Sequence, residues 1–219
     1  MHDDPAWPDV QAWLAASPRP VDVLPVGPGQ GERTLQALQV TTRSVLGAVA
    51  LHTGGLLLDH GWLRILGAGS ERLRGSLGSW NGLDGAAPEP PLSGALIVAH
   101  DAVGGFFAIN GGALGDQTGD VYYFAPDTLA WEDLDKGYSA FVQWAIAGDM
   151  DRFYTDARWP GWADELRALS PDYGILVYPF PWAQGGPIAE RSRKSVPMSE
   201  LWSLQHDVAR QVRVADRAE

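Results

Sequence analysis

Six acidic residues lie between positions 116 and 135, in a stretch that contains no lysine or arginine. Asp116, Thr118, Asp120 and Asp127 stand at positions 1, 3, 5 and 12 of the loop that binds calcium in EF-hand proteins. Val121 occupies the place where that loop requires glycine, and no glutamate closes it. Calcium binding is therefore not expected, and we predict instead that the carboxylates contact a partner. The predicted partner-binding residues are Asp116, Asp120, Asp127, Glu132, Asp133 and Asp135.

The residue patterns that most often carry catalysis or bind metals are absent from this sequence. It has no cysteine, no His-x-x-x-His or His-Glu-x-x-His spacing, and no Gly-x-Ser-x-Gly turn. Asp59–His60, His100–Asp101 and His206–Asp207 are adjacent pairs, and adjacent residues of a strand point to opposite faces. A phosphate-binding P-loop requires a lysine, and the chain has none before position 136. We therefore predict no catalytic residue, no metal site and no cofactor.

A hydrolase that acts on a glycan through paired carboxylates is the alternative function that the sequence leaves open. Among 27 Asp and Glu residues some pair can always lie at a suitable distance, and ten tryptophans suit stacking on sugar rings. Most of these tryptophans lie within helix or strand patterns, however, where each buries a large apolar area in a core. The sequence therefore favours a non-catalytic binding protein over an enzyme.

The balance of charge argues against one class of partner. The chain has 16 Lys and Arg against 27 Asp and Glu, which gives a formal net charge of −11. Nucleic-acid binding requires the opposite sign, so we expect no nucleic-acid partner. A basic protein, such as a toxin domain, fits the acidic stretch better. The oligomeric state is left open.

The pattern of apolar residues predicts both strands and helices, with a meander of strands in the middle of the chain. The strand at 106–109 is apolar on both alternating faces, so both should be covered. We therefore expect one domain over residues 1–219, in which an α/β extension at about 156–219 packs on a core at about 5–155. Strands are expected at 21–26, 45–51, 55–60, 61–66, 95–99, 106–109, 121–124, 127–134 and 173–180. Helices are expected at 8–17, 27–42, 136–149, 160–169 and 198–212.

Three motifs, "QVTTRS", "GGFFAINGGALG" and "YYFAPDTLAWE", are specific enough to indicate a family. Over nearly the whole chain the sequence resembles an uncharacterised bacterial family, a domain of unknown function that supplies no site residues. The order of "GGFFAI", "GDVYYF", "LAWEDL" and a following helix also resembles the SUKH superfamily, over about residues 5–155. That second resemblance implies an α+β fold with a SUKH-like core, a mainly antiparallel sheet with helices packed on it. It also implies an immunity-type role, in which the protein binds and neutralises a bacterial toxin.

Neither a signal peptide nor a membrane span is expected. The first residues, "MHDDPAWPDV", are acidic and contain no apolar core. The longest apolar region, 46–66, is interrupted by Asp59 and Arg64 and contains two histidines. We therefore expect a cytoplasmic protein.

We predict that the purified protein carries no stoichiometric transition metal. Such ions are held by cysteine or by clustered histidine side chains, whereas this chain has no cysteine and five scattered histidines. Elemental analysis of protein purified without chelators measures this directly. One zinc or iron per chain would show the prediction to be wrong.

Overall fold

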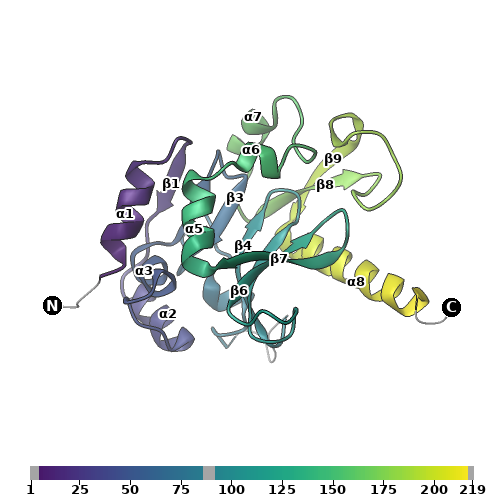
Figure 1. Ribbon diagram of the computed structural model, residues 1–219. Helices are drawn as coiled ribbons and strands as arrows, with labels where there is room; N and C mark the ends of the chain where they lie inside the picture. Colours follow the sequence, from purple (N-terminus) through teal and green to yellow (C-terminus); the bar gives the residue numbers. More distant parts are fainter. Residues whose placement is uncertain (1–4, 86–91, 217–219) are drawn as a thin grey trace.

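The computed structural model describes residues 5–85 and 92–216. The first four residues of the acidic segment "MHDDPAWPDV" lie outside the described residues. Within the described ranges, seven strands form one antiparallel sheet in which each strand pairs with the next one in sequence (Figure 1). The prediction of an α+β fold with a mainly antiparallel sheet is confirmed. The strands are β1 (Val21–Leu24), β2 (Gly55–Leu58), β3 (Leu63–Leu66), β4 (Ala95–Asp101), β5 (Phe106–Asn110), β6 (Asp120–Ala125) and β7 (Ala130–Gly137).

Three helices cover one face of the sheet. Phe107 of β5 points to this face, and its ring centre lies 5.0 Å from that of Phe141 in helix α5. The three helices contact one another and lie together on one side of the sheet in Figure 1. A further helix, α2 (Gln30–Leu38), packs on α3. The covering helices are α1 (Trp7–Ala15), α3 (Val45–His52) and α5 (Tyr138–Ala147).

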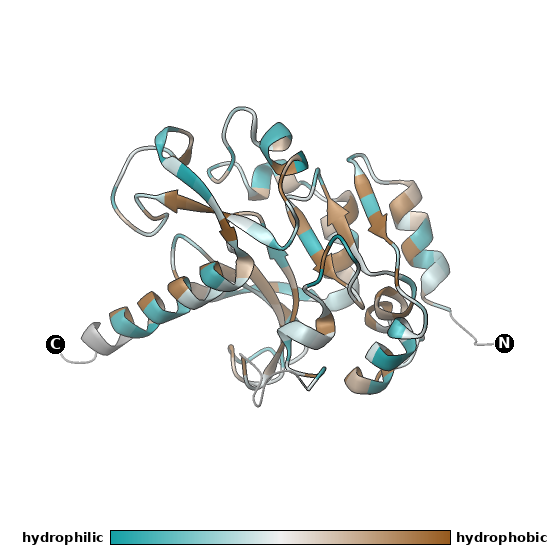
Figure 2. Cartoon of the chain, turned by 180° about the vertical axis from the view of Figure 1, so that it is seen from behind, coloured by the Kyte–Doolittle hydropathy of each residue, from teal (hydrophilic) through white to brown (hydrophobic). Residues whose placement is uncertain are grey.

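The C-terminal part of the chain covers the opposite face. Phe106 is adjacent to Phe107 and therefore points the other way, where Trp202 meets its ring edge-on at a centroid distance of 4.7 Å. The backbone amide of Ile175 donates to the carbonyl of Ala102 at 2.7 Å, which ties the second sheet to the first. Figure 2 shows hydrophobic and hydrophilic residues alternating along α8, as expected for a helix with one buried side. The covering elements are β8 (Tyr173–Tyr178), β9 (Ser192–Pro197) and α8 (Met198–Asp216).

The strand predicted at 45–51 is wrong, because Val45–His52 forms α3. The Ser44 side chain caps this helix by accepting a hydrogen bond from the amide of Gly47 at 3.1 Å. An apolar run without a clear period is compatible with a buried helix as well as with a buried strand. Here the N-terminal cap formed by Ser44 favours the helix. Although α3 is strongly apolar it has only eight residues. Across the part of the chain that the structure describes, no helix combines the length and the apolar character that crossing a membrane would require.

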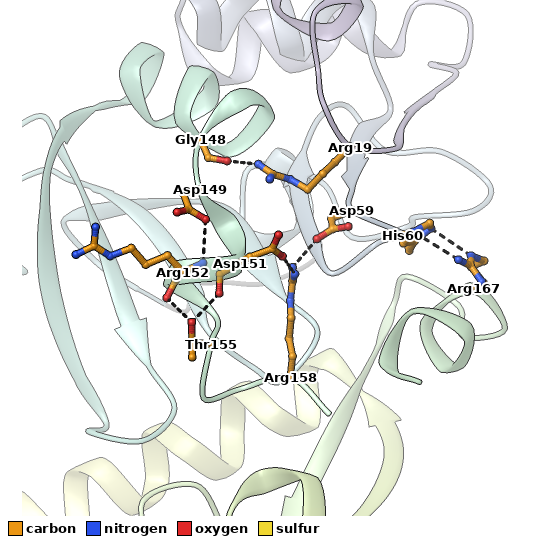
Figure 3. A network of polar contacts seen from close by, with 10 residues as sticks. All are labelled: Arg19, Asp59, His60, Gly148, Asp149, Asp151, Arg152, Thr155, Arg158 and Arg167. Carbon is orange, nitrogen blue, oxygen red and sulfur yellow. Dashed lines mark hydrogen bonds and ion pairs between the residues drawn. The ribbon is translucent and has the colours of Figure 1, made fainter. Parts of the chain in front are cut away.

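Arg158 fastens the connection between α6 (Met150–Phe153) and α7 (Trp162–Arg167) to the sheet (Figure 3). Its two terminal nitrogens donate to Asp59 and Asp151, each at 2.6 Å. Its guanidinium carbon lies 4.2 Å from the ring centre of Trp162 and 4.9 Å from that of Trp62, within the range of cation–π attraction. Asp59 lies in the turn between β2 and β3. The ion pair therefore fixes the 150–167 segment relative to that turn.

We predict that a fragment of residues 1–155 aggregates when it is expressed alone. Removing residues 156–219 takes away α8 and the second sheet, so Phe106 and the neighbouring apolar side chains lose their cover. Size-exclusion chromatography and thermal unfolding of the fragment test this. A soluble fragment that unfolds cooperatively would contradict it, and would make the C-terminal extension a separate unit.

Candidate functional site

The structure divides the six predicted partner-binding residues into two groups. Asp127, in the turn between β6 and β7, and Glu132, on β7, line one pocket. The other four do not appear in the described lining of that pocket. Glu132 pairs with Tyr123 across the sheet, whereas its neighbour Asp133 pairs with Tyr122 and points to the opposite face. The second group consists of Asp116, Asp120, Asp133 and Asp135.

The glycine-rich loop that precedes β6 and contains Asp116 is an ordered hairpin connection. Its hydrogen bonds come largely from Asn110, the last residue of β5. The Asn110 side-chain oxygen accepts from the amides of Gly112 and Leu114 at 2.7 and 3.0 Å, and its amide group donates to the carbonyl of Gly115 at 2.8 Å. The Asn110 side chain therefore pairs with several backbone groups of the turn, as expected for a connection between two buried strands.

The pocket next to Asp127 and Glu132 has a volume of about 480 Å³. One side is formed by β6, β7 and the segment around α6, and the other by residues 181–188. Three carboxylates and three aromatic rings are among the side chains around it: Asp127, Glu132, Asp156, Tyr123, Phe153 and Tyr154.

The one guanidinium group in the described lining of this pocket is engaged with backbone carbonyls. Arg191 donates to the carbonyl oxygens of Phe180 at 2.6 Å, Gly186 at 2.8 Å and Pro179 at 3.1 Å. These bonds hold the 179–187 segment in place as the far wall. The positive charge of Arg191 thus organises the loop and forms no ion pair with a carboxylate of the described residues.

The three carboxylates of the pocket are exposed, and within the described ranges none of them forms an ion pair. Glu132 accepts one hydrogen bond, from the hydroxyl of Thr128 at 2.9 Å. Three carboxylates against one guanidinium make the described lining net negative, which favours a positively charged group in the pocket.

Asp101 is not in the described lining of the pocket. Its side chain accepts a hydrogen bond from Tyr123, one of the two tyrosines that line it. Its Oδ1 accepts from the amides of Val103 and Gly105 at 3.0 and 2.7 Å, and Tyr123 donates its hydroxyl to Oδ2 at 2.9 Å. A Cβ atom at Gly105 would lie 2.2 Å from this carboxylate, so the turn requires glycine there. Asp101 is fully buried, and its hydrogen bonds shape the β4–β5 turn.

Burial sets the ionisation of these groups. It raises the pKa of Asp101 above the ordinary value of 3.8, and the bonds from Gly105 and Tyr123 oppose this rise. Burial, followed by the charge of Asp101, raises the pKa of Tyr123 and of Tyr154 well above 10. Both phenols are therefore protonated at neutral pH. The hydroxyl of Tyr154 is buried and makes no hydrogen bond of normal geometry with a described residue.

His100 and Asp101 point to opposite faces of β4. His100 pairs across the sheet with Arg64 and Phe106, and its ring nitrogens have no hydrogen-bond partner among the described residues. Burial, and then the charge of Arg64, lower the pKa of His100 well below 6.5, so the ring is neutral. No three His, Asp or Glu side chains of the described chain gather where they could share a metal ion.

Sequence reasoning missed Tyr123, Tyr154 and Asp156 as parts of this pocket. The sequence predicts Tyr123 to lie in a buried strand, which gives no reason to expect it at a pocket. Tyr154 and Asp156 belong to a segment that the ion pairs of Arg158 position against the sheet, and these contacts cannot be read from the sequence. The one available signal was the alternation in "VYYF", which puts Tyr123 on the opposite face from Tyr122.

The family and two relatives place the chain among bacterial proteins of unknown function. Residues 1–201 match the family described as "Protein of unknown function DUF2625". The chain is 44% identical over 208 residues to the uncharacterised protein YbfG of Escherichia coli K12, covering 94% of this chain and 93% of the relative. It is 37% identical over 174 residues to an uncharacterised protein of Haemophilus influenzae, covering 80% and 76%. No solved structure matches. The expected membership of an uncharacterised bacterial family is confirmed, while the SUKH resemblance stays a prediction.

We predict that Asp101→Asn changes how stability depends on pH. In the unfolded chain Asp101 ionises near 3.8, and in the folded protein it ionises at higher pH. Between these values the unfolded chain has released a proton that the folded chain still holds, so the wild type loses stability as pH rises. The Asp101→Asn variant lacks this group, and the wild type should lose stability relative to it from about pH 4 upward. Urea denaturation at several pH values measures the difference.

Asp101→Ala is the matched control for the hydrogen bonds. It leaves two backbone amides and the Tyr123 hydroxyl without their acceptor, which should cost about 3 kcal/mol or more of unfolding free energy at every pH. Asn can still accept both amide bonds through one oxygen, so it should cost less. A wild type that gains stability relative to Asp101→Asn as pH rises would contradict the raised pKa.

Proposed function

This chain belongs to the family described as protein of unknown function DUF2625, and we propose that it is a non-catalytic protein-binding module that receives a basic side chain of its partner. The observation that carries the proposal is the group of three carboxylates without an ion-pair partner among the described residues, open on one pocket lined with aromatic rings. The proposal narrows the six acidic residues expected from the sequence to Asp127 and Glu132, and adds Asp156.

The chemistry of the pocket suits the head of an arginine or lysine. Carboxylates at its edge supply acceptors for charge-assisted hydrogen bonds. Phe153, Tyr123 and Tyr154 supply aromatic surface of the kind that attracts cations. Phe153 is 37% exposed, so part of its ring is free for contact. The volume of about 480 Å³ holds one long side chain together with part of the segment that carries it.

Two features support binding over catalysis. Asp101, whose pKa burial raises, is fully buried, and its carboxylate is occupied by two amides and a tyrosine hydroxyl. A substrate in the pocket would meet the tyrosines before it reached this carboxylate. The three carboxylates that a ligand can reach are exposed, as suits a surface that pairs with charge.

The acidic balance of the chain supports a basic protein as the partner. With a net charge of −11, the protein attracts a positively charged domain over a distance and speeds their encounter. A toxin domain that acts on nucleic acid carries such positive charge, so an immunity-type role is the physiological form of this proposal. Exposed charges are screened by salt, and association should slow as ionic strength rises.

The test compares two triple variants that remove the same charge. Asp127→Asn, Glu132→Gln and Asp156→Asn alter the pocket, and Asp116→Asn, Asp120→Asn and Asp135→Asn alter the second group. Affinity capture from the source cells identifies the partner, and surface plasmon resonance then measures association at low salt and at ~0.15 M. We expect the pocket variant to associate about tenfold more slowly and the matched variant much less so.

Equal association by wild type and pocket variant would overturn the proposal. An equal loss in both triple variants would reduce it to general electrostatic attraction, with no role for the pocket. The hydrolase alternative predicts a different result, namely release of reducing sugar from a glycan by the wild type and none by the pocket variant.

A further inference from the structure

Arg64 is a buried cation that forms no ion pair with a described carboxylate, although the charges of Asp101 and Asp172 act on it over a longer distance. It is 1% exposed, and its side chain donates to the carbonyl oxygens of Gly61 at 2.8 Å, Pro171 at 3.0 Å and Tyr173 at 2.6 Å. None of the ion pairs between described residues includes it. Burial lowers its pKa to about 10, which still leaves it charged at neutral pH. A buried charge of this kind is usually paired, and carbonyl dipoles supply only part of that compensation.

Arg64 lines a pocket of about 240 Å³ in which the charge balance of the chain is reversed. Arg72, Arg167 and His60 line the same space. Asp22 is the one acidic residue among the described lining, and it forms an ion pair with Arg72. In a protein with 27 acidic and 16 basic residues, three arginines and a histidine around one small space are a local exception.

The sheet and the β2–β3 turn hold these groups in place. Asp22, Leu57 and Arg64 are cross-strand neighbours on β1, β2 and β3, so their side chains share one face. His60 lies in the turn with a left-handed backbone (φ 58°). Its Nδ1 accepts a hydrogen bond from Nε of Arg167 at 3.2 Å, as Figure 3 shows. His60 of the turn and Arg167 of α7 therefore line the same pocket as Arg64 of the sheet.

The rest of the lining is apolar. Leu57 from the sheet, and Leu166 and Leu169 from α7 and the connection that follows it, face the same space together with Pro20 and Pro171. Contact with these apolar side chains does not stabilise a bound hydrated inorganic ion, whereas it does stabilise a ligand that has a short hydrocarbon chain. The pocket therefore combines cationic groups for a head with apolar surface for a tail.

We infer that this pocket binds a compact organic oxyanion, with the charged head between Arg64, Arg72 and Arg167 and a short apolar body against the leucines. Arginine forks match both carboxylate and phosphate oxygens, so the two heads share this chemistry. The described lining has no residue in common with the acidic pocket. The inference is therefore independent of the proposed protein partner.

Calorimetry on the full chain tests the inference with probes that differ in one feature each. Butyrate and butyl phosphate carry both head and tail, inorganic phosphate carries the head alone, and butanol and butylamine carry the tail without the negative charge. We expect saturable binding of butyrate, butyl phosphate or both, weaker binding of inorganic phosphate, and none of butanol or butylamine. The preferred head distinguishes a carboxylate from a phosphate ligand.

Arg167→Gln is the decisive variant, because the side chain is exposed and its loss should leave the fold intact. We expect it to weaken the preferred probe about tenfold. Arg210→Gln is the matched control, since Arg210 forms the same i,i+3 ion pair on another helix, with Asp207, as Arg167 forms with Asp164. No saturable binding of either tailed probe, or an equal affinity in wild type and Arg167→Gln, would overturn the inference. So would an equal loss in both variants.

Discussion

Phe106 and Phe107 are adjacent in β5, and each is buried against a different layer of the protein. Phe107 packs against α5, and Phe106 packs against α8. The sheet is therefore buried between helices from the first two thirds of the chain and elements from the last third. Both pockets lie beside the connections that lead from one cover to the other, where side chains no longer fill the space between layers.

The same burial determines how the polar groups of the central strands are compensated. Three neighbouring buried side chains offset the free-energy cost of desolvation, each in a different way. Asp101 accepts hydrogen bonds from the turn that it shapes, Arg64 donates to backbone carbonyls, and His100 stays neutral. Two of these compensations place a side chain at one of the pockets. Asp101 fixes Tyr123 at the acidic pocket, and Arg64 leaves a positive charge at the basic one.

The ion pair between Arg158 and Asp59 connects the two pockets. On one side of Arg158 in the chain, Tyr154 and Asp156 line the acidic pocket, and the guanidinium lies 5.5 Å from the Tyr154 ring centre. Next to Asp59, His60 lines the basic pocket. Arg158 is largely buried, and its second ion pair, with Asp151, and the rings of Trp62 and Trp162 hold it in place together with Asp59.

The sequence alone determined most of the helices and strands, because those depend on local periodicity, and the order of these elements resembled an α+β fold. Alternation in "FFAI" and "VYYF" identified strands with two buried faces, and the spacing of Leu201, Leu204 and Val208 identified α8. Local pattern could not separate helix from strand at 45–51, where every side chain is apolar or small. It also missed β9, because the strand begins with the polar residues Ser192, Arg193 and Lys194, which show no alternation with apolar side chains.

The pockets were decided by tertiary structure. Acidic residues close in sequence are separated by the two faces of β7, whereas Glu132 and Asp156 are brought together from distant segments. The three arginines of the basic pocket come from β3, from the segment after it and from α7, and no spacing in the chain relates them. Composition fixes how much charge a chain carries, but only the packing of layers decides which charges share a space and which of them lack a partner.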